Sequence, residues 1–253
     1  MLLRDELVVV TGASRGLGAA VARAAHREGA WVVVNYYRSP DLAAELTSEL
    51  QTRALAVQAD VRSSSAVQQM IKKAEAWSKR PVSGLVNNAL VDYRFNGDGR
   101  DRLEALEWSA IAKQLEGSVG GSINTLKACY ESMRKAGKGS VVNIGTNLFQ
   151  NPVVPYHDYT ASKGALLALT RTAAKEWGAQ GIRVNMVSGG LLRKTDASAA
   201  TPDAVFDLIA ESTPLRYVTT PQEMADSVVF FLSALARGVT GQNLVVDGGL
   251  VMN

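Results

Sequence analysis

Two residues able to carry acid–base chemistry lie close together in the second half of the chain, Tyr159 and Lys163. Their spacing is one helical turn plus a fraction, so on a helix both side chains lie on one face. A tyrosine hydroxyl with its ordinary pKa near 10 is a poor proton donor or base at neutral pH, and a nearby ammonium favours the phenolate. Tyr156 has Thr160 at the same spacing and cannot form such a pair. The pair also occurs on ordinary amphipathic helices, but here it follows the fifth expected strand and indicates a tyrosine acid tuned by a lysine.

A second feature with chemical meaning is a glycine-rich turn that reads Thr-Gly-Ala-Ser-Arg-Gly-Leu-Gly. It joins an apolar run, 7–10, to an alanine-rich stretch, 19–25, which predicts a strand, a turn and a helix. Glycine allows a sharp turn, a close approach of the backbone to a pyrophosphate, and tight packing of helix on strand. The helix N-terminus presents N–H groups and partial positive charge to phosphates. The turn predicts a dinucleotide site with Gly12, Ser14, Arg15, Gly16, Leu17 and Gly18 as its residues.

The same turn also fits the Gly-x-Ser-x-Gly pattern that carries the nucleophilic serine of many hydrolases. Such a serine needs a later acid and then a histidine, and the only histidine that follows an acid downstream of Ser14 is His157. A basic residue beside the serine, on the first strand of a chain, would be unusual for that class. A serine hydrolase using Ser14 is therefore a minor alternative to dinucleotide binding.

The end of the second apolar run bears on the choice of cofactor. It reads Asn35-Tyr36-Tyr37-Arg38, without the acid that binds a ribose 2′-hydroxyl and selects NAD. Arg38, together with Arg15, is suited to hold a 2′-phosphate through charge-assisted hydrogen bonds. Either arginine alone would be an ordinary surface charge, but jointly they favour NADP.

Short β-branched runs alternate with longer helical patterns, which predicts a parallel sheet with helices on both faces. The expected strands are 7–10, 31–35, 54–59, 84–87, 140–145, 183–187 and 243–246. The expected helices are 17–28, 41–52, 65–78, 102–136, 158–179 and 221–235. The stretch 102–136 is too long for one helix, and Gly117, Gly120 and Gly121 should break or bend it, since an interior glycine costs about 1 kcal/mol relative to alanine.

Two segments show little regular pattern, 91–101 and 188–214. Each follows a strand at the sheet edge where ligands bind in open α/β folds. We expect them to form substrate walls and, near 188–214, a mobile substrate loop that begins with the pair Gly189-Gly190. The alternative is that both are plain surface loops.

Composition limits the class of protein. The 253 residues are 47% hydrophobic with a net charge of +3, so one domain spanning 1–253 is expected, without a basic run of the nucleic-acid-binding kind. One cysteine, Cys129, and two histidines leave no disulfide framework and no metal cluster to expect, and Cys129 reads as a small buried apolar side chain on a helix. The acidic N-terminus and the lack of an apolar stretch of about 20 residues argue against a signal peptide or membrane span, so we expect a cytoplasmic protein.

Six segments match motifs that recur together in one family and are specific as a set, although each is weak alone. They are 11–18, Asp60-Val61, Asn87-Asn88-Ala89, Tyr159-Thr160-Ala161-Ser162-Lys163, Arg183-Val184-Asn185 and Val246-Asp247-Gly248-Gly249. On these segments, which cover nearly the full length, the chain resembles the short-chain dehydrogenase/reductase family. The resemblance implies an α/β fold, a Rossmann-type doubly wound, mainly seven-stranded parallel sheet with helices on both faces.

The resemblance implies roles for the candidate catalytic residues. Tyr159 would be the proton donor, while Lys163 would hold the nicotinamide ribose and lower the pKa of the tyrosine. The family's serine 13 residues before the tyrosine is Thr146 here, whose hydroxyl can still donate to a substrate carbonyl while its methyl narrows the pocket. Alternatively, Thr146 only caps the end of its strand.

The family usually completes a proton relay with a helix asparagine, and this chain lacks one at that place. Counting back from Met133 leads to Ser118 and counting forward from Trp108 leads to Leu115. We assign Ser118 as the substitute catalytic residue, because Asn124 lies too far along the helix.

Further cofactor contacts follow from the same resemblance. Asp60 and Val61 would border the adenine, and Asn88 and Ala89 would line the cleft, although these two also suit an ordinary strand-ending turn. Gly190 and Leu192 would contact the nicotinamide amide through the backbone.

These features predict NADPH-dependent reduction of a ketone, most similar to the bacterial 3-oxoacyl-acyl carrier protein reductase branch and hence to fatty acid biosynthesis. Another small carbonyl or alcohol substrate, or a non-catalytic NADP sensor, are the alternatives. Arg134, Lys135 and Lys138 are a candidate contact for an acidic carrier protein, or else a basic helix end that balances the helix dipole. Apolar walls suit an acyl chain but also many other ketones; they are Leu148, Phe149, Val153, Val154, Leu191 and Leu192.

The resemblance also implies a homotetramer. The helices near 102–136 and 158–179 would pack between subunits, with 250–253 near another interface. Small residues on the second helix would allow close approach, or else they pack on the sheet within one subunit; they are Ala161, Gly164, Ala165 and Ala168.

Overall fold

Strand β1 (Leu7–Val10) is a short apolar run whose side chains contribute to two separate apolar cores, one on each face of the sheet. The computed structural model describes residues 1–93, 95, 99–193, 195 and 198–252. In β1 the side chains of Leu7 and Val9 belong to one apolar core, and those of Val8 and Val10 belong to the other. Successive side chains of a strand point to opposite faces, so a strand without polar residues must be covered on both faces.

Within the described residues the strands form one seven-stranded sheet in the order β3-β2-β1-β4-β5-β6-β7, and every pairing is parallel. The sheet predicted from the sequence is confirmed. The order reverses at β1, so a crevice between the carboxyl ends of β1 and β4 is where an open sheet of this kind binds ligands. The other strands are β2 (Trp31–Tyr36), β3 (Ala54–Gln58), β4 (Val82–Asn87), β5 (Gly139–Thr146), β6 (Ile182–Gly189) and β7 (Asn243–Val246).

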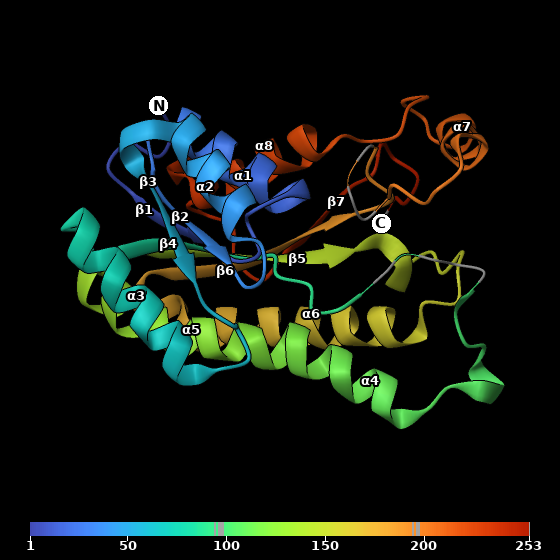
Figure 1. The fold of residues 1–253 in the computed structure, drawn as a ribbon, viewed down its shortest axis with the longest axis horizontal. Coiled ribbons are helices and arrows are strands. Elements are labelled where there is room, and N and C mark those ends of the chain that lie inside the picture. Colours follow the sequence, from blue (N-terminus) through green and yellow to red (C-terminus); the bar gives the residue numbers. More distant parts are fainter. Residues whose placement is uncertain (94, 96–98, 194, 196–197, 253) are drawn as a thin grey trace.

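Helices cover both faces of the sheet (Figure 1). One face carries α1 (Gly16–Arg27), α2 (Pro40–Leu50) and α8 (Pro221–Leu232). The opposite face carries α3 (Ser64–Ser78), α5 (Gly121–Ala136) and α6 (His157–Trp177). This doubly wound arrangement exposes one edge of the sheet, where the strands end, to the loops that hold the candidate site.

The long helical stretch predicted over 102–136 is interrupted where its glycines lie, as expected. Helix α4 (Trp108–Leu115) leads into a π-helical turn, Glu116–Gly120, and then into α5. A Cβ atom at Gly117 would lie 2.8 Å from Val91 Cβ, and one at Gly121 would lie 2.8 Å from Val61 Cγ2. These glycines therefore let the loops after β3 and β4 press directly on the helix.

The prediction of an irregular loop over 188–214 is wrong for the second half of this segment, because helix α7 (Asp203–Ser212) lies within it. Pro202 precedes the helix, Asp203 stands in its first turn, and Phe206 is buried beneath it. Gly189 belongs to β6, where a Cβ would lie 2.7 Å from Met224 Sδ, so packing rather than loop freedom requires glycine there. Positions 194, 196 and 197 of this segment, like 94 and 96–98 of the other and the terminal 253, lie outside the described residues.

Cys129 is buried on α5, as predicted, and burial raises the pKa of its thiol far above the ordinary range. Over the part of the chain that the structure describes, no group of three or more His, Cys, Asp or Glu side chains is arranged to hold a metal ion. In the same residues, no helix combines the length and the apolar character needed to cross a membrane.

Candidate active site

Tyr159 and Lys163 lie on the face of α6 that packs against the sheet. Both are buried, with 8% and 3% of their surface exposed. Lys163 Nζ donates a hydrogen bond of 2.7 Å to the carbonyl oxygen of Ile144 in β5, and it lies 5.7 Å from the centre of the Tyr159 ring. The predicted pairing on one helix face is therefore present, and β5 supplies its polar partner.

Thr146 is the last residue of β5 and is also buried. Its hydroxyl accepts a hydrogen bond of 3.3 Å from the backbone N–H of Leu148, so it caps the turn that follows the strand. Its side chain also hydrogen-bonds the Tyr159 hydroxyl. Thr146 can therefore cap the turn after β5 and contact the Tyr159 hydroxyl at the same time.

Burial decides the protonation of this pair. It raises the pKa of Tyr159 to about 12, against the lowering effect of the Thr146 hydrogen bond. It also lowers the pKa of Lys163 to about 8. The expectation that the ammonium shifts Tyr159 toward phenolate is wrong for this arrangement, because loss of hydration of the phenolate outweighs a cation that is bonded elsewhere. Tyr159 holds its proton at neutral pH.

Ser118 lies in the π-helical turn and is buried. Its carbonyl accepts a hydrogen bond of 2.7 Å from Ser122, whereas its hydroxyl has no hydrogen-bond partner among the described residues. A buried hydroxyl without a partner is costly and is commonly satisfied by an ordered water. Asn124 is engaged elsewhere, donating to the carbonyls of Val61 and Arg62 at 2.9 and 3.1 Å.

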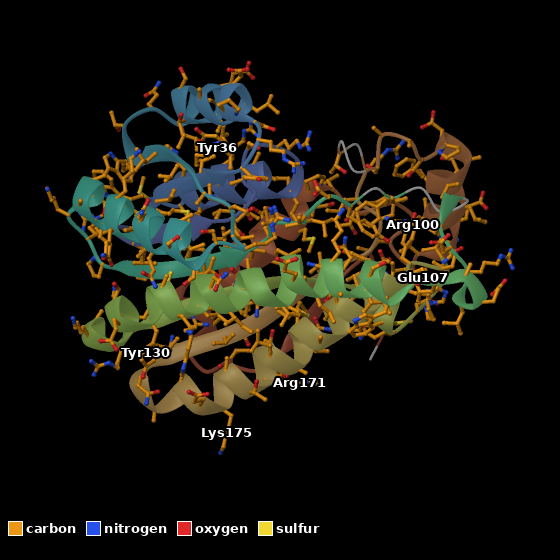
Figure 2. The ribbon with its side chains drawn as sticks, turned by 60° about the horizontal axis from the view of Figure 1, so that its bottom comes forward. Tyr36, Arg100, Glu107, Tyr130, Arg171 and Lys175 are labelled. Atoms are coloured by element: carbon orange, nitrogen blue, oxygen red, sulfur yellow. The ribbon has the colours of Figure 1, made fainter. Side chains whose placement is uncertain are left out.

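An aromatic cluster that the sequence analysis missed surrounds the Tyr159 ring. The rings of Tyr93 and Phe95 lie 5.0 and 5.3 Å from it, centre to centre, and both also contact Tyr156. Arg100 places its guanidinium 3.9 Å from the centre of the Tyr93 ring. Figure 2 shows Arg100 among crowded side chains near Glu107, at the start of α4. The described residues Tyr93, Phe95 and Arg100 of this segment thus pack close to Tyr159 and to one another, but the aromatic residues carried no helical or strand period that would reveal the cluster.

The glycine turn has the cradle that a dinucleotide requires. Gly12 has φ +60° and Gly16 has φ +56°, both in the left-handed region that favours glycine. A Cβ at Gly18 would lie 2.4 Å from the Gly12 carbonyl oxygen, so the third glycine allows α1 to start close to the turn. Arg15, at the helix N-cap, makes no side-chain capping bond, and the first N–H groups of α1 keep their capacity for phosphate.

Asn88 holds this turn rather than facing the cleft with a free amide. Its Nδ2 donates to the carbonyls of Thr11 and Gly12 at 2.9 and 3.0 Å, and the Thr11 hydroxyl accepts from Asn88 N and Ala89 N. Asn35, which sequence reasoning did not single out, accepts from Gly12 N at 3.2 Å and donates to the carbonyls of residues 57 and 59. Two asparagines therefore fix the position of the predicted phosphate loop.

Asp60 and Arg38, both expected near the adenosine, each form an ion pair within the protein. Asp60 forms a two-pronged pair with Arg62, with contacts from 2.7 to 3.1 Å, which lowers the pKa of the carboxyl. Arg38 Nη1 lies 2.8 Å from Asp92 Oδ1 and stacks over the Tyr37 ring. Arg38 thus lies just after β2, and a carboxylate that the sequence did not point to is bound to it.

A chain of buried polar side chains ties the helices to the sheet beneath the site. Thr125 donates to Asn87 at 2.6 Å, Asn87 donates to Asn143 at 2.8 Å, and Asn143 donates to Thr170 at 2.8 Å. Asn87 and Asn143 are register partners on β4 and β5. Each amide thereby finds its partners, which a buried amide requires, and α5 and α6 are held in fixed positions.

Gly190 lies in a tight space at the end of β6. A Cβ there would lie 3.0 Å from Asn147 Nδ2, and this amide donates to Asp247 at 2.9 Å. Asp247 also accepts hydrogen bonds from Gly249 N and Val251 N, so one carboxylate joins the C-terminal turn to Asn147 after β5. Leu192 packs against the core on the α1 side.

Two predicted surfaces differ from expectation. Val153, expected in the substrate wall, is 68% exposed. The basic residues at the end of α5 lie at the start of β5, whereas Thr146 lies at its end, about 23 Å away for a strand of this length. Arg134 pairs with Glu131 at 2.9 Å and Lys138 pairs with Glu6 at 2.8 Å. This cluster therefore lies at the opposite end of β5 from the candidate site, and the carrier-protein contact expected there stays a prediction.

Comparison with known proteins places the chain among reductases. The sequence pattern of a family described as "Enoyl-(Acyl carrier protein) reductase" matches residues 12–251. The chain is 36% identical to an A-factor type gamma-butyrolactone 1′-reductase (1S-forming) from Streptomyces virginiae, over 99% of this chain and 97% of that protein. It is 33% identical to a 3-oxoacyl-[acyl-carrier-protein] reductase from Synechocystis, over 99% and 98%, and 31% identical to FabG from Staphylococcus epidermidis, over 98% and 100%.

These relatives are named as reductases and match along nearly their whole length, which leaves the hydrolase alternative for Ser14 without support. The doubly wound sheet, the glycine turn between β1 and α1, and the Tyr159–Lys163 pair on α6 lie where the sequence resemblance required them. Reductases of this kind use nicotinamide cofactors, and the cradle at Gly12 and Gly18 fits such a group. The chain belongs to the short-chain dehydrogenase/reductase family and is an oxidoreductase that acts on CH–OH and C=O groups.

Proposed function

We propose that the protein is an NADPH-dependent ketone reductase whose catalytic residues are Thr146, Tyr159 and Lys163, with Ser118 in support. The observation that carries this proposal is the burial of a protonated tyrosine beside a threonine hydroxyl at the end of β5. A pKa of about 12 keeps Tyr159 protonated at neutral pH, but it also makes the hydroxyl a weaker acid than an ordinary tyrosine, so the phenolate that forms on proton transfer needs the positive charge of Lys163.

The bound cofactor would supply the hydride to the ketone carbon. Tyr159 gives its proton to the carbonyl oxygen, and Thr146 donates a hydrogen bond that orients the same oxygen. Lys163 is charged below its pKa of about 8 and stabilises the negative charge that forms on Tyr159 when the proton leaves. Its Nζ would also donate to the ribose hydroxyls of the bound cofactor. Ser118, buried with an unpartnered hydroxyl, would bind a water that returns a proton to the site.

The choice of NADP rests on charge at the end of β2. Arg38 and Arg15 would be the cations that bind a 2′-phosphate, and no acid stands at Tyr36, where NAD-selecting proteins place one. The remaining proposed contacts with the cofactor come from the cleft described above: Gly12, Ser14, Gly16, Leu17, Gly18, Asp60, Val61, Asn88, Ala89, Gly190 and Leu192.

For the substrate we propose a 3-oxoacyl thioester, as the names of two relatives suggest, handled by one domain that covers 1–253. A specific observation favours a second candidate, a compact cyclic ketone. The aromatic rings packed around Tyr159 are better suited to a flat ring than to a long aliphatic chain, and the lactone reductase is 36% identical. An acyl carrier protein stays a possible partner for the thioester.

The deciding experiment measures NADPH oxidation with a matched panel: 3-oxoacyl thioesters on coenzyme A and on acyl carrier protein, acyl-substituted lactones, small ketones, sugars and quinones. NADH replaces NADPH in parallel assays. Highest kcat/KM with an oxoacyl thioester supports the first substrate, and highest kcat/KM with a lactone ketone supports the second. Absence of turnover with every member, together with tight NADPH binding, would support the NADP sensor instead.

A further inference from the structure

Asp92 occupies a position between two cations from different elements. Its Oδ1 lies 2.8 Å from Arg38 Nη1, just after β2, and its Oδ2 lies 3.9 Å from Lys113 Nζ on α4. Asp92 itself follows β4 and has φ +47°, a left-handed conformation that aspartate tolerates better than most residues. The chain is thus turned so that one carboxylate faces both cations.

Arg38 has a second neighbour, the ring of Tyr37 just after β2, where proteins with this fold bind the ribose of the cofactor. Its guanidinium lies 4.9 Å from the centre of the Tyr37 ring, and Arg62 lies 5.8 Å from the same centre. Arg62 is held by two-pronged bonds to Asp60, whereas Arg38 is held by a single contact to Asp92. Arg38 and Asp92 are 63% and 34% exposed, so water and salt weaken their pair.

We propose, resting on the NADPH-dependent function above, that Asp92 is a cofactor-specificity residue. Its carboxylate occupies on Arg38 the place that a 2′-phosphate takes, so NADP(H) binds by displacing Asp92 toward Lys113. NAD(H), which lacks the 2′-phosphate, leaves the Arg38–Asp92 pair intact. The single residue Asp92 therefore reduces the preference for NADP that Arg38 alone would create.

Two physical reasons support displacement. A 2′-phosphate carries more charge and more acceptor oxygens than a carboxylate, and it can engage the arginine fork with two bonds. The displaced carboxylate keeps a partner because Lys113 already lies within 4 Å. The loop need not open for this exchange, which leaves the next residue, Tyr93, stacked on Tyr159.

The test measures dissociation constants for NADPH, NADH, 2′,5′-ADP and 5′-ADP by fluorescence and calorimetry in the parent and in Asp92→Asn. We expect NADPH and 2′,5′-ADP to bind about three- to tenfold more tightly in the variant at low salt, and less so at high salt, where exposed charges are screened. NADH and 5′-ADP should bind as in the parent. Asp92→Glu, which keeps the charge, should resemble the parent.

Two further variants make the result specific. Lys113→Gln removes the second partner and should weaken NADPH binding without changing NADH binding. Asp226→Asn breaks an equally exposed Arg–Asp pair, Arg27 with Asp226 at 2.6 Å, on another face and should change neither constant.

An unchanged NADPH-to-NADH ratio in Asp92→Asn would overturn the inference. So would a loss of NADH affinity, because it would mean that Asp92 binds ribose hydroxyls. The parent's own ratio and its turnover test the proposed function, whereas the change in the ratio upon substitution tests Asp92. A parent that prefers NADH would therefore refute the NADPH proposal and still leave the role of Asp92 to be read from the variant.

Discussion

At the scale of single residues, burial sets the chemistry of Tyr159 and Lys163 more strongly than their closeness does. The lysine ammonium bonds the Ile144 carbonyl, and the tyrosine hydroxyl bonds Thr146, so each has its own partner. The tyrosine therefore starts protonated, as an acid for reduction must. The lysine is near its titration point at mildly alkaline pH, with a pKa of about 8.

Replacing Tyr159 by phenylalanine removes the proposed proton donor and little volume. We expect turnover with the best ketone to fall by at least about 10²-fold, the usual loss for a general acid, with NADPH affinity nearly unchanged. Thr146→Ser should keep activity and Thr146→Ala should lose most of it, because the hydroxyl is the working group. Ser118→Ala should cause a small loss. Full activity in Tyr159→Phe would exclude this mechanism and favour another acid.

Lys163 also makes the stability of the protein depend on pH in a defined direction. Its pKa is lowered from 10.5 to about 8 on burial, so between these values the unfolded state binds a proton that the folded state has lost. The free energy of unfolding therefore rises with pH across this window, and the penalty for burying the charge is present in full below pH 8.

Lys163→Met should accordingly be more stable than the parent at pH 7, by about 1–3 kcal/mol, and inactive. The difference should shrink as the pH approaches 10. Urea unfolding at several pH values measures it, with the exposed Lys175→Met on the same helix as the control (Figure 2). A stability difference independent of pH would show that Lys163 does not titrate in this window.

At the scale of elements, the π-helical junction between α4 and α5 packs directly against the loops that follow β3 and β4. The π-helical turn places Ser118 inside the protein, and the flanking glycines allow Val61 and Val91 to touch the helix backbone. Val61 follows Asp60, which is proposed to border the adenine, and Val91 precedes Asp92. Helix packing here thus sets the position of both loops that border the cleft.

Gly121→Ala and Gly120→Ala form a matched pair that tests this packing. A Cβ at Gly121 would meet Val61 at 2.8 Å, whereas at Gly120 the nearest atom is 3.9 Å away. We expect Gly121→Ala to lose about 1–3 kcal/mol of stability through overpacking and to weaken NADPH binding, measured by urea unfolding and fluorescence titration. Gly120→Ala should be neutral or gain up to about 1 kcal/mol. Equal behaviour of the two variants would contradict a packing role.

At the scale of the whole molecule, α6 presents two different faces. Lys163, Leu166 and Thr170 are buried against the sheet, whereas Ala161 and Ala168 are exposed. Gly164 has no atom within 4 Å of the place a Cβ would take. The small residues therefore do not pack on the sheet, which was the alternative considered, and they leave a smooth outer face suited to another helix.

We expect a homotetramer that uses this face, as measured by light scattering at micromolar concentration. Ala168→Glu should shift the protein toward smaller species, because two like charges would meet at a helix contact, while circular dichroism stays unchanged. Ala44→Glu on α2, an exposed alanine on the opposite layer, should keep the parent's mass. A monomeric parent, or identical masses for both variants, would refute the proposed assembly.

The local features of this fold could be predicted from the sequence because each rests on short-range physics. Apolar runs such as Leu7–Val10 read as strands buried on both faces, and the glycines at 12, 16 and 18 mark backbone that only glycine adopts or that packs tightly. The interrupted helix near Gly117 followed from glycine spacing. Helix α7 was missed because the whole segment after β6 was assigned to a substrate loop, although Pro202 and Asp203 suit a helix start and Val205, Phe206 and Ile209 recur at helical spacing.

What only the tertiary structure decided depends on residues far apart in the chain. The sequence named Arg38 but could not show that Asp92, 54 residues later, pairs with it. It named Tyr159 but not the Tyr93 and Phe95 rings against it, because contacts between loops leave no periodic trace. It predicted a lowered tyrosine pKa, whereas burial raised it. Residue type and spacing thus determined which chemical groups are present. Their charge states and their partners were decided by desolvation and long-range contacts, because both depend on three-dimensional packing.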